Sequence, residues 1–103
     1  MLTTKQRAYL RSQANKLNPV FQVGKNGVAP TVTEAVDACL EANELIKISV
    51  LNNCDEDTRD IADQLSGRTR SEVVQVIGKK IVLYRESKDN KKIVLPKERK
   101  GQL

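Results

Sequence analysis

Histidine and tryptophan are absent from this 103-residue chain, and aromatic residues make up only 3% of it. Histidine is the commonest general base near neutral pH and the commonest zinc ligand, so its absence removes Ser/His and Cys/His catalysis and most catalytic metal sites. No apolar run approaches the roughly 18 residues that a membrane span needs. The composition therefore argues against an enzyme and against a membrane protein, and we expect no cofactor and no metal ion.

Cysteine is also scarce. Cys39 and Cys54 lie too far apart for a CxxC unit and are too few for a disulfide framework. Residues 1–16 are polar and contain no apolar stretch that would mark secretion. We therefore expect one domain with reduced cysteines, in a monomeric and cytoplasmic protein.

Charge is unevenly distributed along the chain, whose net charge is +5. Residues 1–30 contain five cations and no acid, whereas residues 31–66 contain nine acids and two cations. If the acidic middle folds onto one side of the molecule, positive potential is concentrated elsewhere, which favours a polyanionic partner. Ordinary solvated surface charge is the alternative explanation.

Hydrophobic periodicity predicts the element order helix, strand, helix, strand, helix, strand, strand. We expect these elements near residues 4–16, 20–23, 31–44, 45–51, 55–67, 73–77 and 81–84. Alternating strands and helices followed by a hairpin favour an α/β two-layer sandwich with a mixed four-stranded sheet. Gly78 suits the first position of a type II′ hairpin turn. Residues 93–95 either add an edge strand or stay loose.

Helix ends are marked by specific residues. Capping boxes are expected at Thr3 with Gln6 and at Thr31 with Glu34, and Gly67 is expected to close the third helix. The second helix is amphipathic, and its apolar face is expected to carry Val32, Ala35, Val36, Cys39 and Leu40. Its polar face is expected to carry Glu34, Asp37, Glu41 and Glu44.

The segment Gly24-Lys25-Asn26-Gly27 lies between a predicted strand and a predicted helix. Glycine allows positive φ and close approach to a ligand, and the helix N-terminus offers unsatisfied N–H groups. With Lys25 added, this GxxG turn suits a phosphate group. Its spacing matches neither the nucleotide P-loop nor the dinucleotide GxGxxG pattern, and an ordinary glycine-containing turn is the alternative.

Further basic residues are candidates for extending such a contact. They are Lys5, Arg7, Arg11, Arg68, Arg70, Lys79 and Lys80. The two arginines of the first helix are four residues apart with no acid nearby, an arrangement that costs about 0.2–0.5 kcal/mol. The two arginines before the third strand can each bind phosphate with paired hydrogen bonds. Lysines at a hairpin turn also serve to block aggregation of sheets, which is the alternative role for the last pair.

Aromatic residues decide between modes of nucleic-acid binding. Only Tyr9, Phe21 and Tyr84 are present, and we expect all three to pack in the core. Proteins that stack successive bases of a single strand need an aromatic platform, which this chain lacks. Recognition of structured RNA through its backbone and shape is therefore favoured.

Several ordered motifs resemble the CRM domain family, named for chloroplast RNA splicing and ribosome maturation, and in particular its bacterial stand-alone YhbY-type members. The motifs are Leu2-Thr3-Thr4-Lys5-Gln6-Arg7, Leu17-Asn18-Pro19, Val23-Gly24-Lys25-Asn26-Gly27, Glu44-Leu45-Ile46-Lys47, Val74-Gln75-Val76-Ile77-Gly78-Lys79 and Val82-Leu83-Tyr84-Arg85. The resemblance covers about residues 1–96, which we take as the domain, and leaves residues 97–103 as a basic tail.

This resemblance implies a fold similar to the C-terminal domain of translation initiation factor three. It also implies RNA binding through a GxxG loop like that of KH domains, here Gly24, Lys25, Asn26 and Gly27, and association with precursors of the large ribosomal subunit. The expected partners are therefore ribosomal RNA and also ribosomal proteins.

We accordingly predict a non-enzymatic RNA-binding protein that acts in ribosome assembly. One alternative is an adaptor whose acidic second-helix face, with Glu34, Asp37 and Glu41, docks a basic ribosomal protein. A second alternative is a metal-dependent hydrolase that uses the acids between Asp55 and Asp63, although these acids fit the start and surface of a helix.

Overall fold

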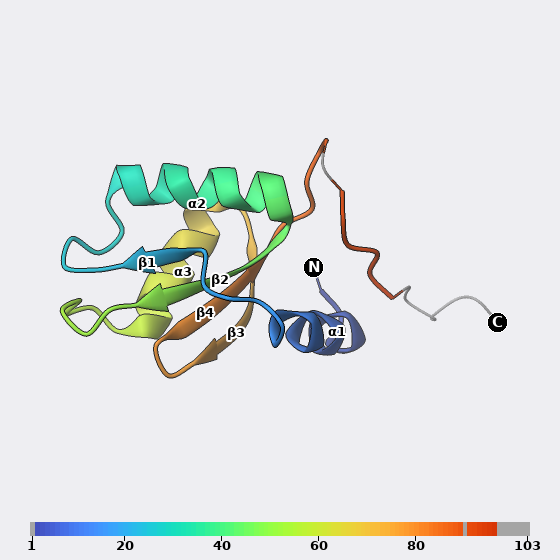
Figure 1. Ribbon diagram of the computed structural model, residues 1–103, viewed down its shortest axis with the longest axis horizontal. Helices are drawn as coiled ribbons and strands as arrows, with labels where there is room; N and C mark the ends of the chain where they lie inside the picture. Colours follow the sequence, from blue (N-terminus) through green and yellow to red (C-terminus); the bar gives the residue numbers. More distant parts are fainter. Residues whose placement is uncertain (1, 90, 97–103) are drawn as a thin grey trace.

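The computed structural model describes residues 2–89 and 91–96, and its elements follow the predicted order (Figure 1). They are α1 (Thr4–Ala14), β1 (Phe21–Val23), α2 (Pro30–Asn43), β2 (Leu45–Val50), α3 (Thr58–Thr69), β3 (Glu72–Ile77) and β4 (Lys80–Tyr84). The strands form one sheet in the order β1-β2-β4-β3. β1 is parallel to β2 and the other two pairings are antiparallel, so the predicted α/β class with a mixed four-stranded sheet is confirmed.

Both faces of the sheet are covered by helices. On one face, Leu40 of α2 and Leu65 of α3 pack with Leu83 of β4 in the larger buried cluster. On the other face, Leu10 of α1 packs with Val82 of β4 in a smaller cluster. Because the side chains of successive strand residues point to opposite faces, neighbouring residues of β4 pack in different clusters. The sheet with α2 and α3 makes the two expected layers, and α1 adds a layer on the second face.

The first helix begins as predicted and ends earlier. Thr3 Oγ1 accepts a hydrogen bond from the Gln6 backbone N–H at 3.0 Å, and Gln6 Oε1 accepts one from the Thr3 N–H at 3.1 Å, which completes the capping box. The helix ends at Ala14, two residues before the predicted end at residue 16. Tyr84 is buried, and Tyr9 packs against the same cluster, as expected for core residues.

The capping box predicted at Thr31 and Glu34 is wrong. α2 begins at Pro30, and its N-cap residue Ala29 makes no side-chain capping bond. Proline is suited to the first turn of a helix because its missing N–H would have no partner there, so it starts the helix one residue before Thr31.

The third helix also differs from expectation at both ends. It begins at Thr58, where the Asp57 carboxylate accepts the Arg59 N–H at 3.2 Å, and it continues through Gly67 to Thr69. Arg70 closes it with a left-handed φ of 59°. The end is stabilised beyond Gly67 because the Thr69 hydroxyl donates to the Leu65 carbonyl at 2.7 Å, so the predicted closure at Gly67 is wrong.

The strands deviate from expectation by single residues at their ends. β1 begins at Phe21 and β2 ends at Val50. The turn between β3 and β4 consists of Gly78 and Lys79, and Gly78 has a φ of 55°. A type II′ turn requires such a positive φ at its first position. Cys39 and Cys54 are both free. Within the described ranges, no helix is long and apolar enough to cross a membrane.

Glu44 was expected on the polar face of the second helix, and this prediction is wrong. Its exposed fraction is 0%, and its backbone has a φ of 66° at the end of α2. Its carboxylate accepts the backbone N–H groups of Ser87 at 2.8 Å, Lys92 at 2.6 Å and Ile93 at 2.8 Å. Residues 93–95 form no strand. The Ile93 N–H is bound by the Glu44 side chain rather than by a neighbouring strand, and Ile93 and Leu95 pack against the α1 cluster.

Candidate nucleic-acid interface

The GxxG turn holds its two middle residues in solvent. The Gly27 N–H donates to the Gly24 carbonyl at 3.0 Å, and Gly27 has a φ of 61°. Lys25 and Asn26 are exposed, whereas Gly27 is buried. The left-handed conformation favours glycine at this corner, and the closed turn presents a lysine and an amide side by side. This geometry suits contact with a phosphate group.

An acidic side chain lies against the inner side of the same turn. A Cβ atom added to Gly27 would lie 2.2 Å from Glu56 Oε2, so no side chain fits there unless Glu56 moves. Gln64 Nε2 donates to Glu56 Oε1 at 2.8 Å and helps to hold this carboxylate in place. Because a carboxylate repels an anion, an anion would approach the turn from the side of Lys25 and Asn26. In the sequence, Glu56 was considered only among the acids between Asp55 and Asp63, which fit the start and surface of a helix, and not as a neighbour of the GxxG turn.

The N-terminus of α2 follows the turn after two residues. Its N-cap Ala29 supplies no side-chain acceptor, and Pro30 occupies the first turn. Arg68 of α3 reaches across and donates from Nη1 to the Val28 carbonyl at 2.9 Å. This bond fixes the segment that joins the turn to α2, so Arg68 lies beside the turn and acts in holding its position.

Two further predicted residues lie at the same end of the sheet. The Val50 N–H donates to the Lys79 carbonyl at 2.7 Å, and the Leu51 N–H donates to the Val23 carbonyl at 2.8 Å. The end of β2 is therefore flanked by the GxxG turn on one side and by the β3–β4 turn on the other. Lys79 and Lys80 are exposed. We call Lys25, Asn26, Lys79 and Lys80 the turn-end cluster.

The predicted residues of the first helix lie elsewhere. Figure 1 shows α1 beside one end of the sheet, while the GxxG turn and the β3–β4 turn lie toward the other. The helix that carries Lys5, Arg7 and Arg11 therefore lies apart from the GxxG turn, although its C-terminal end reaches Lys80, since Ala14 and Asn15 line one cavity with that lysine. Arg7 also binds within the protein, since Nη1 donates to the Val73 carbonyl and Nη2 lies 4.0 Å from a carboxylate oxygen of Glu72.

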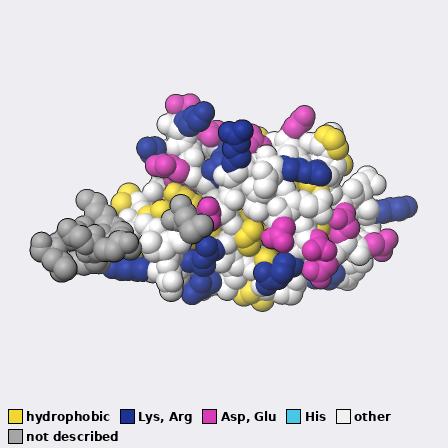
Figure 2. All heavy atoms as spheres, turned by 180° about the vertical axis from the view of Figure 1, so that it is seen from behind, with side chains coloured by type: hydrophobic (Ala, Val, Ile, Leu, Met, Phe, Trp, Pro, Cys, Tyr) yellow, Lys and Arg dark blue, Asp and Glu magenta, His cyan; other side chains and the backbone are white. Residues whose placement is uncertain are grey.

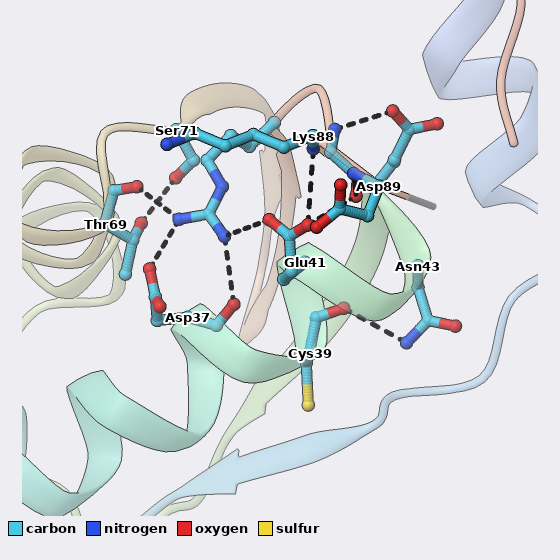
Figure 3. A network of polar contacts seen from close by, with 11 residues as sticks. Asp37, Cys39, Glu41, Asn43, Thr69, Ser71, Lys88 and Asp89 are labelled. Atoms are coloured by element: carbon cyan, nitrogen blue, oxygen red, sulfur yellow. Dashed lines mark hydrogen bonds and ion pairs between the residues drawn. The ribbon is translucent and has the colours of Figure 1, made fainter. Parts of the chain in front are cut away.

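Arg70 lies in a third place, beside a polar cavity of about 400 Å³ between α2, the end of α3 and residues 85–88. Arg85, which the sequence analysis did not select, organises this cavity. Its Nη1 donates to Asp37 Oδ1 at 2.5 Å and to the Thr69 carbonyl at 2.9 Å, and its Nη2 lies 3.5 Å from Glu41 Oε1. Figure 3 shows Asp37, Glu41 and Thr69 converging there. No local pattern marks Arg85, because its partners come from distant helices.

Positive and negative groups are mixed on the rear of the molecule. In Figure 2, Lys and Arg side chains lie among Asp and Glu side chains, and the acids are densest toward the end away from the grey residues. The residues selected from the sequence thus do not form one patch. The turn-end cluster carries its cations on exposed turns, and Arg68 lies between the GxxG turn and the cavity beside Arg70, because it binds the Val28 carbonyl and also lines that cavity.

Comparison with known proteins places this architecture in a family. Residues 2–85 match the CRS1 / YhbY (CRM) domain. The chain belongs to this family. The first predicted motif and the last lie within the matched range, so the resemblance stated from the sequence is confirmed.

Relatives of this CRM domain have similar length. "Probable RNA-binding protein YqeI" of Bacillus subtilis is 55% identical over 96 residues, which are 93% of this chain and 100% of the relative. "RNA-binding protein" of Haemophilus influenzae is 37% identical over 97 residues, covering 94% of this chain and 97% of the relative. The solution structure of SAV1595 from Staphylococcus aureus is 53% identical, with a TM-score of 0.79 over 93% of this chain and 100% of that chain.

In this CRM domain, the segment after residue 85 lies beyond the family match. It is attached through Glu41 of α2 and through Glu44, the residue that follows α2. Burial alone would raise the pKa of Glu44, but the N–H groups of Lys92, Ser87 and Ile93 outweigh it and hold the pKa below its ordinary value. The Ser87 hydroxyl is the main cause of a lowered pKa at Glu41. These carboxylates therefore remain charged and keep the segment bound at neutral pH.

No group of three or more His, Cys, Asp or Glu residues capable of holding a metal ion occurs among residues 2–89 and 91–96 of the CRM domain. The names of the family's curated relatives describe RNA-binding proteins and no enzyme.

Proposed function

We propose that this CRM domain binds structured RNA through the sugar-phosphate backbone and acts in assembly of the large ribosomal subunit. The observation that carries the proposal is the closed GxxG turn, which exposes Lys25 and Asn26 directly before the uncapped N-terminus of α2. A lysine, an amide and a positive helix end favour a phosphate oxygen.

Each residue of the turn region has its own role in this mechanism. Lys25 neutralises a phosphate, and Asn26 offers an amide hydrogen bond. Gly27 supplies the backbone shape, and Arg68 holds the Val28 carbonyl so that the turn keeps its position. Lys79 and Lys80 extend the positive surface across the end of β2.

The basic residues outside the turn-end cluster have a secondary place in the proposal. Lys5 and Arg11 of α1 supply positive charge at a distance from the turn, where a long RNA helix can reach. Arg7 is largely used within the protein by the Val73 carbonyl and Glu72. Arg70 lies beside a cavity that also contains acids. We therefore expect the turn-end cluster to contribute most to affinity.

The relatives support RNA as the partner, since the Bacillus subtilis and Haemophilus influenzae proteins are both named as RNA-binding proteins. The place in ribosome assembly rests on the family resemblance, which links CRM domains to ribosome maturation. The lack of an exposed aromatic platform supports binding to folded RNA rather than to an open strand.

The adaptor alternative is less well supported. It needs an acidic α2 face free to receive a basic partner, but Arg85 already binds Asp37 and Glu41. Ser87 and Lys88 donate further hydrogen bonds to Glu41 Oε2 at 2.7 Å and 3.2 Å. These bonds reduce the negative charge that the face presents to another protein.

The test is binding of a ribosomal RNA hairpin measured over a range of salt concentrations. Each phosphate contact contributes about 0.7–0.9 to the slope of log affinity against log salt, so affinity is expected to fall steeply with salt. Lys25→Ala is expected to weaken binding and to lower this slope by about 1 while the thermal unfolding temperature stays unchanged.

Lys91→Ala is the matched control, because Lys91 is exposed but lies near Glu44, away from the turn. An affinity independent of salt would contradict backbone binding. Equal binding by Lys25→Ala and the parent would show that the GxxG segment is only a structural turn.

A further inference from the structure

Part of the sheet face that carries α1 is left uncovered. α1 packs over Leu45, Val74, Val82 and Tyr84, and it ends at Ala14. Beyond Ala14 and Asn15 a cavity of about 200 Å³ opens onto strand residues, among them Lys47, Gln75 and Lys80. The side chains of the sheet in this region therefore face solvent rather than a helix.

The strand register arranges these side chains in two rows. The row next to α1 contains Gln75, Val82 and Lys47. The row beyond it contains Ile77, Lys80, Ser49 and Gln22. Paired residues of neighbouring strands point to the same face, and Val82 belongs to the α1 cluster, so both rows lie on the α1 side. We call these two rows the open sheet face.

Three of the four residues of the outer row are exposed, and the fourth, Ser49, is only 8% exposed. Ile77 is 60% exposed although it is a large apolar residue in a strand. Lys80 and Gln22 are exposed as well, and Ser49 receives a hydrogen bond from Lys80 Nζ at 3.2 Å. This bond holds the lysine across the sheet, with its remaining N–H groups free to meet another acceptor.

The side chains of the open sheet face are suited to binding the sugar-phosphate backbone of a nucleic acid. Its two rows carry Lys47 and Lys80, the side-chain amides of Gln22 and Gln75, and no acid, while the Ser49 hydroxyl is buried beside Lys80. An unopposed pair of lysines attracts phosphate, whereas amides and hydroxyls can both donate to and accept from a ribose 2′-OH. The one aromatic residue of the strands on this side, Tyr84, is buried under α1, so no base can stack there.

The open sheet face is continuous with the turn-end cluster. Lys80 belongs to both, because it is the first residue of β4 after the β3–β4 turn. Gln22 pairs with Ser49 and lies two residues before Gly24 in the chain. A ligand that lies on the GxxG turn can therefore extend over the end of the sheet onto this face.

We propose that the open sheet face is a second contact surface for an RNA helix, on which Lys47 and Lys80 bind phosphates while Gln22 and Gln75 hydrogen-bond to ribose 2′-OH groups. This inference rests on the proposed function and extends it by naming a second surface, which would distinguish RNA from DNA through the ribose 2′-OH groups. The shallow minor groove of an RNA helix displays 2′-OH groups and phosphates together, as this surface requires.

The experiment compares an RNA hairpin with a DNA hairpin of the same sequence, using the full chain, one single variant and one double variant. Lys47→Ala, at the lysine that belongs to the open sheet face and not to the turn-end cluster, is expected to weaken RNA binding and to lower the salt slope by about 0.7–0.9, since one phosphate contact is lost. Gln22→Ala/Gln75→Ala is expected to leave the salt slope unchanged and to reduce the preference for RNA over DNA. Lys91→Ala controls for the change in charge, and thermal unfolding checks the fold.

The outcomes separate this inference from the proposed function. If Lys25→Ala weakens RNA binding but Lys47→Ala does not, the proposal for the open sheet face is overturned, whereas the proposal for the GxxG turn is not. If the glutamine variant keeps the parent's preference for RNA, the ribose contacts are overturned. If the parent chain binds neither hairpin, the proposed function and this inference both fail.

Discussion

Replacing Glu44 by glutamine tests the attachment of residues 86–89 and 91–96 to the domain. The Glu44 carboxylate is fully buried and accepts three backbone N–H groups, two at Oε1 from Lys92 and Ile93 and one at Oε2 from Ser87. Glutamine keeps one oxygen acceptor, but its NH₂ group cannot accept a hydrogen bond. If the amide oxygen serves Lys92 and Ile93, the Ser87 N–H faces another donor.

The magnitude follows from these three bonds. A hydrogen bond to a charged group contributes about 1.5–3 kcal/mol, and a neutral one about 1 kcal/mol. Glu44→Gln loses one such bond and weakens two, so the free energy of unfolding is expected to fall by about 3–5 kcal/mol. For a domain of this size, that corresponds to a fall in Tm of more than about 12 °C.

Two measurements check this prediction. Urea unfolding gives the change in stability, and amide hydrogen exchange reports whether the N–H groups of Ser87, Lys92 and Ile93 lose protection. Glu34→Gln is the matched control, since Glu34 is an exposed acid of the same helix, and it is expected to change stability by less than about 0.5 kcal/mol. If Glu44→Gln changes the stability no more than Glu34→Gln does, the carboxylate does not hold the segment.

Two further predictions concern the turn and acid stability. Gly27→Ala is expected to destabilise the fold by about 1–2 kcal/mol because Gly27 has a φ of 61°. Gly24→Ala is expected to change stability little, since its added Cβ would lie 3.4 Å from its nearest neighbours. Equal effects of the two variants in thermal unfolding would contradict this prediction. The lowered pKa values of Glu41 and Glu44 stabilise the fold fully above the ordinary Glu pKa of about 4.3, and this contribution is lost as pH falls through the folded-state values. The free energy of unfolding should therefore decline below about pH 4.3 in the parent, and it should decline less steeply in Glu44→Gln. The same pH dependence in both proteins would show that Glu44 does not contribute to acid sensitivity.

Much of the candidate site was predictable because it depends on local backbone chemistry. Gly24 and Gly27 around Lys25 predict a tight, charged turn between a strand and a helix, and the turn is closed by a bond between the two glycines. The exposure of Lys79 at the hairpin follows from the same kind of reasoning, since a two-residue turn leaves its side chains in solvent. The functional role of these residues stays a prediction.

The positions of the basic residues relative to one another could not be predicted in the same way. Arg7, Arg68 and Arg70 look equivalent in the sequence, but they meet different surroundings after folding. Arg7 binds β3, Arg68 binds the segment before α2, and Arg70 lies beside a cavity organised by Arg85. Which arginine is free for a ligand depends on carbonyls and acids that are far away along the chain.

The sequence alone determined the order of helices and strands, the mixed sheet and the hairpin turn, because hydrophobic spacing and glycine act over a few residues. Tertiary structure alone decided the role of Glu44 and the existence of the open sheet face. Glu44 continues the acidic pattern of α2, and only tertiary folding brings the N–H groups of Ser87, Lys92 and Ile93 to its buried carboxylate. Lys47 and Lys80 are 33 residues apart in the sequence, and only the pairing of β2 with β4 brings them onto one surface.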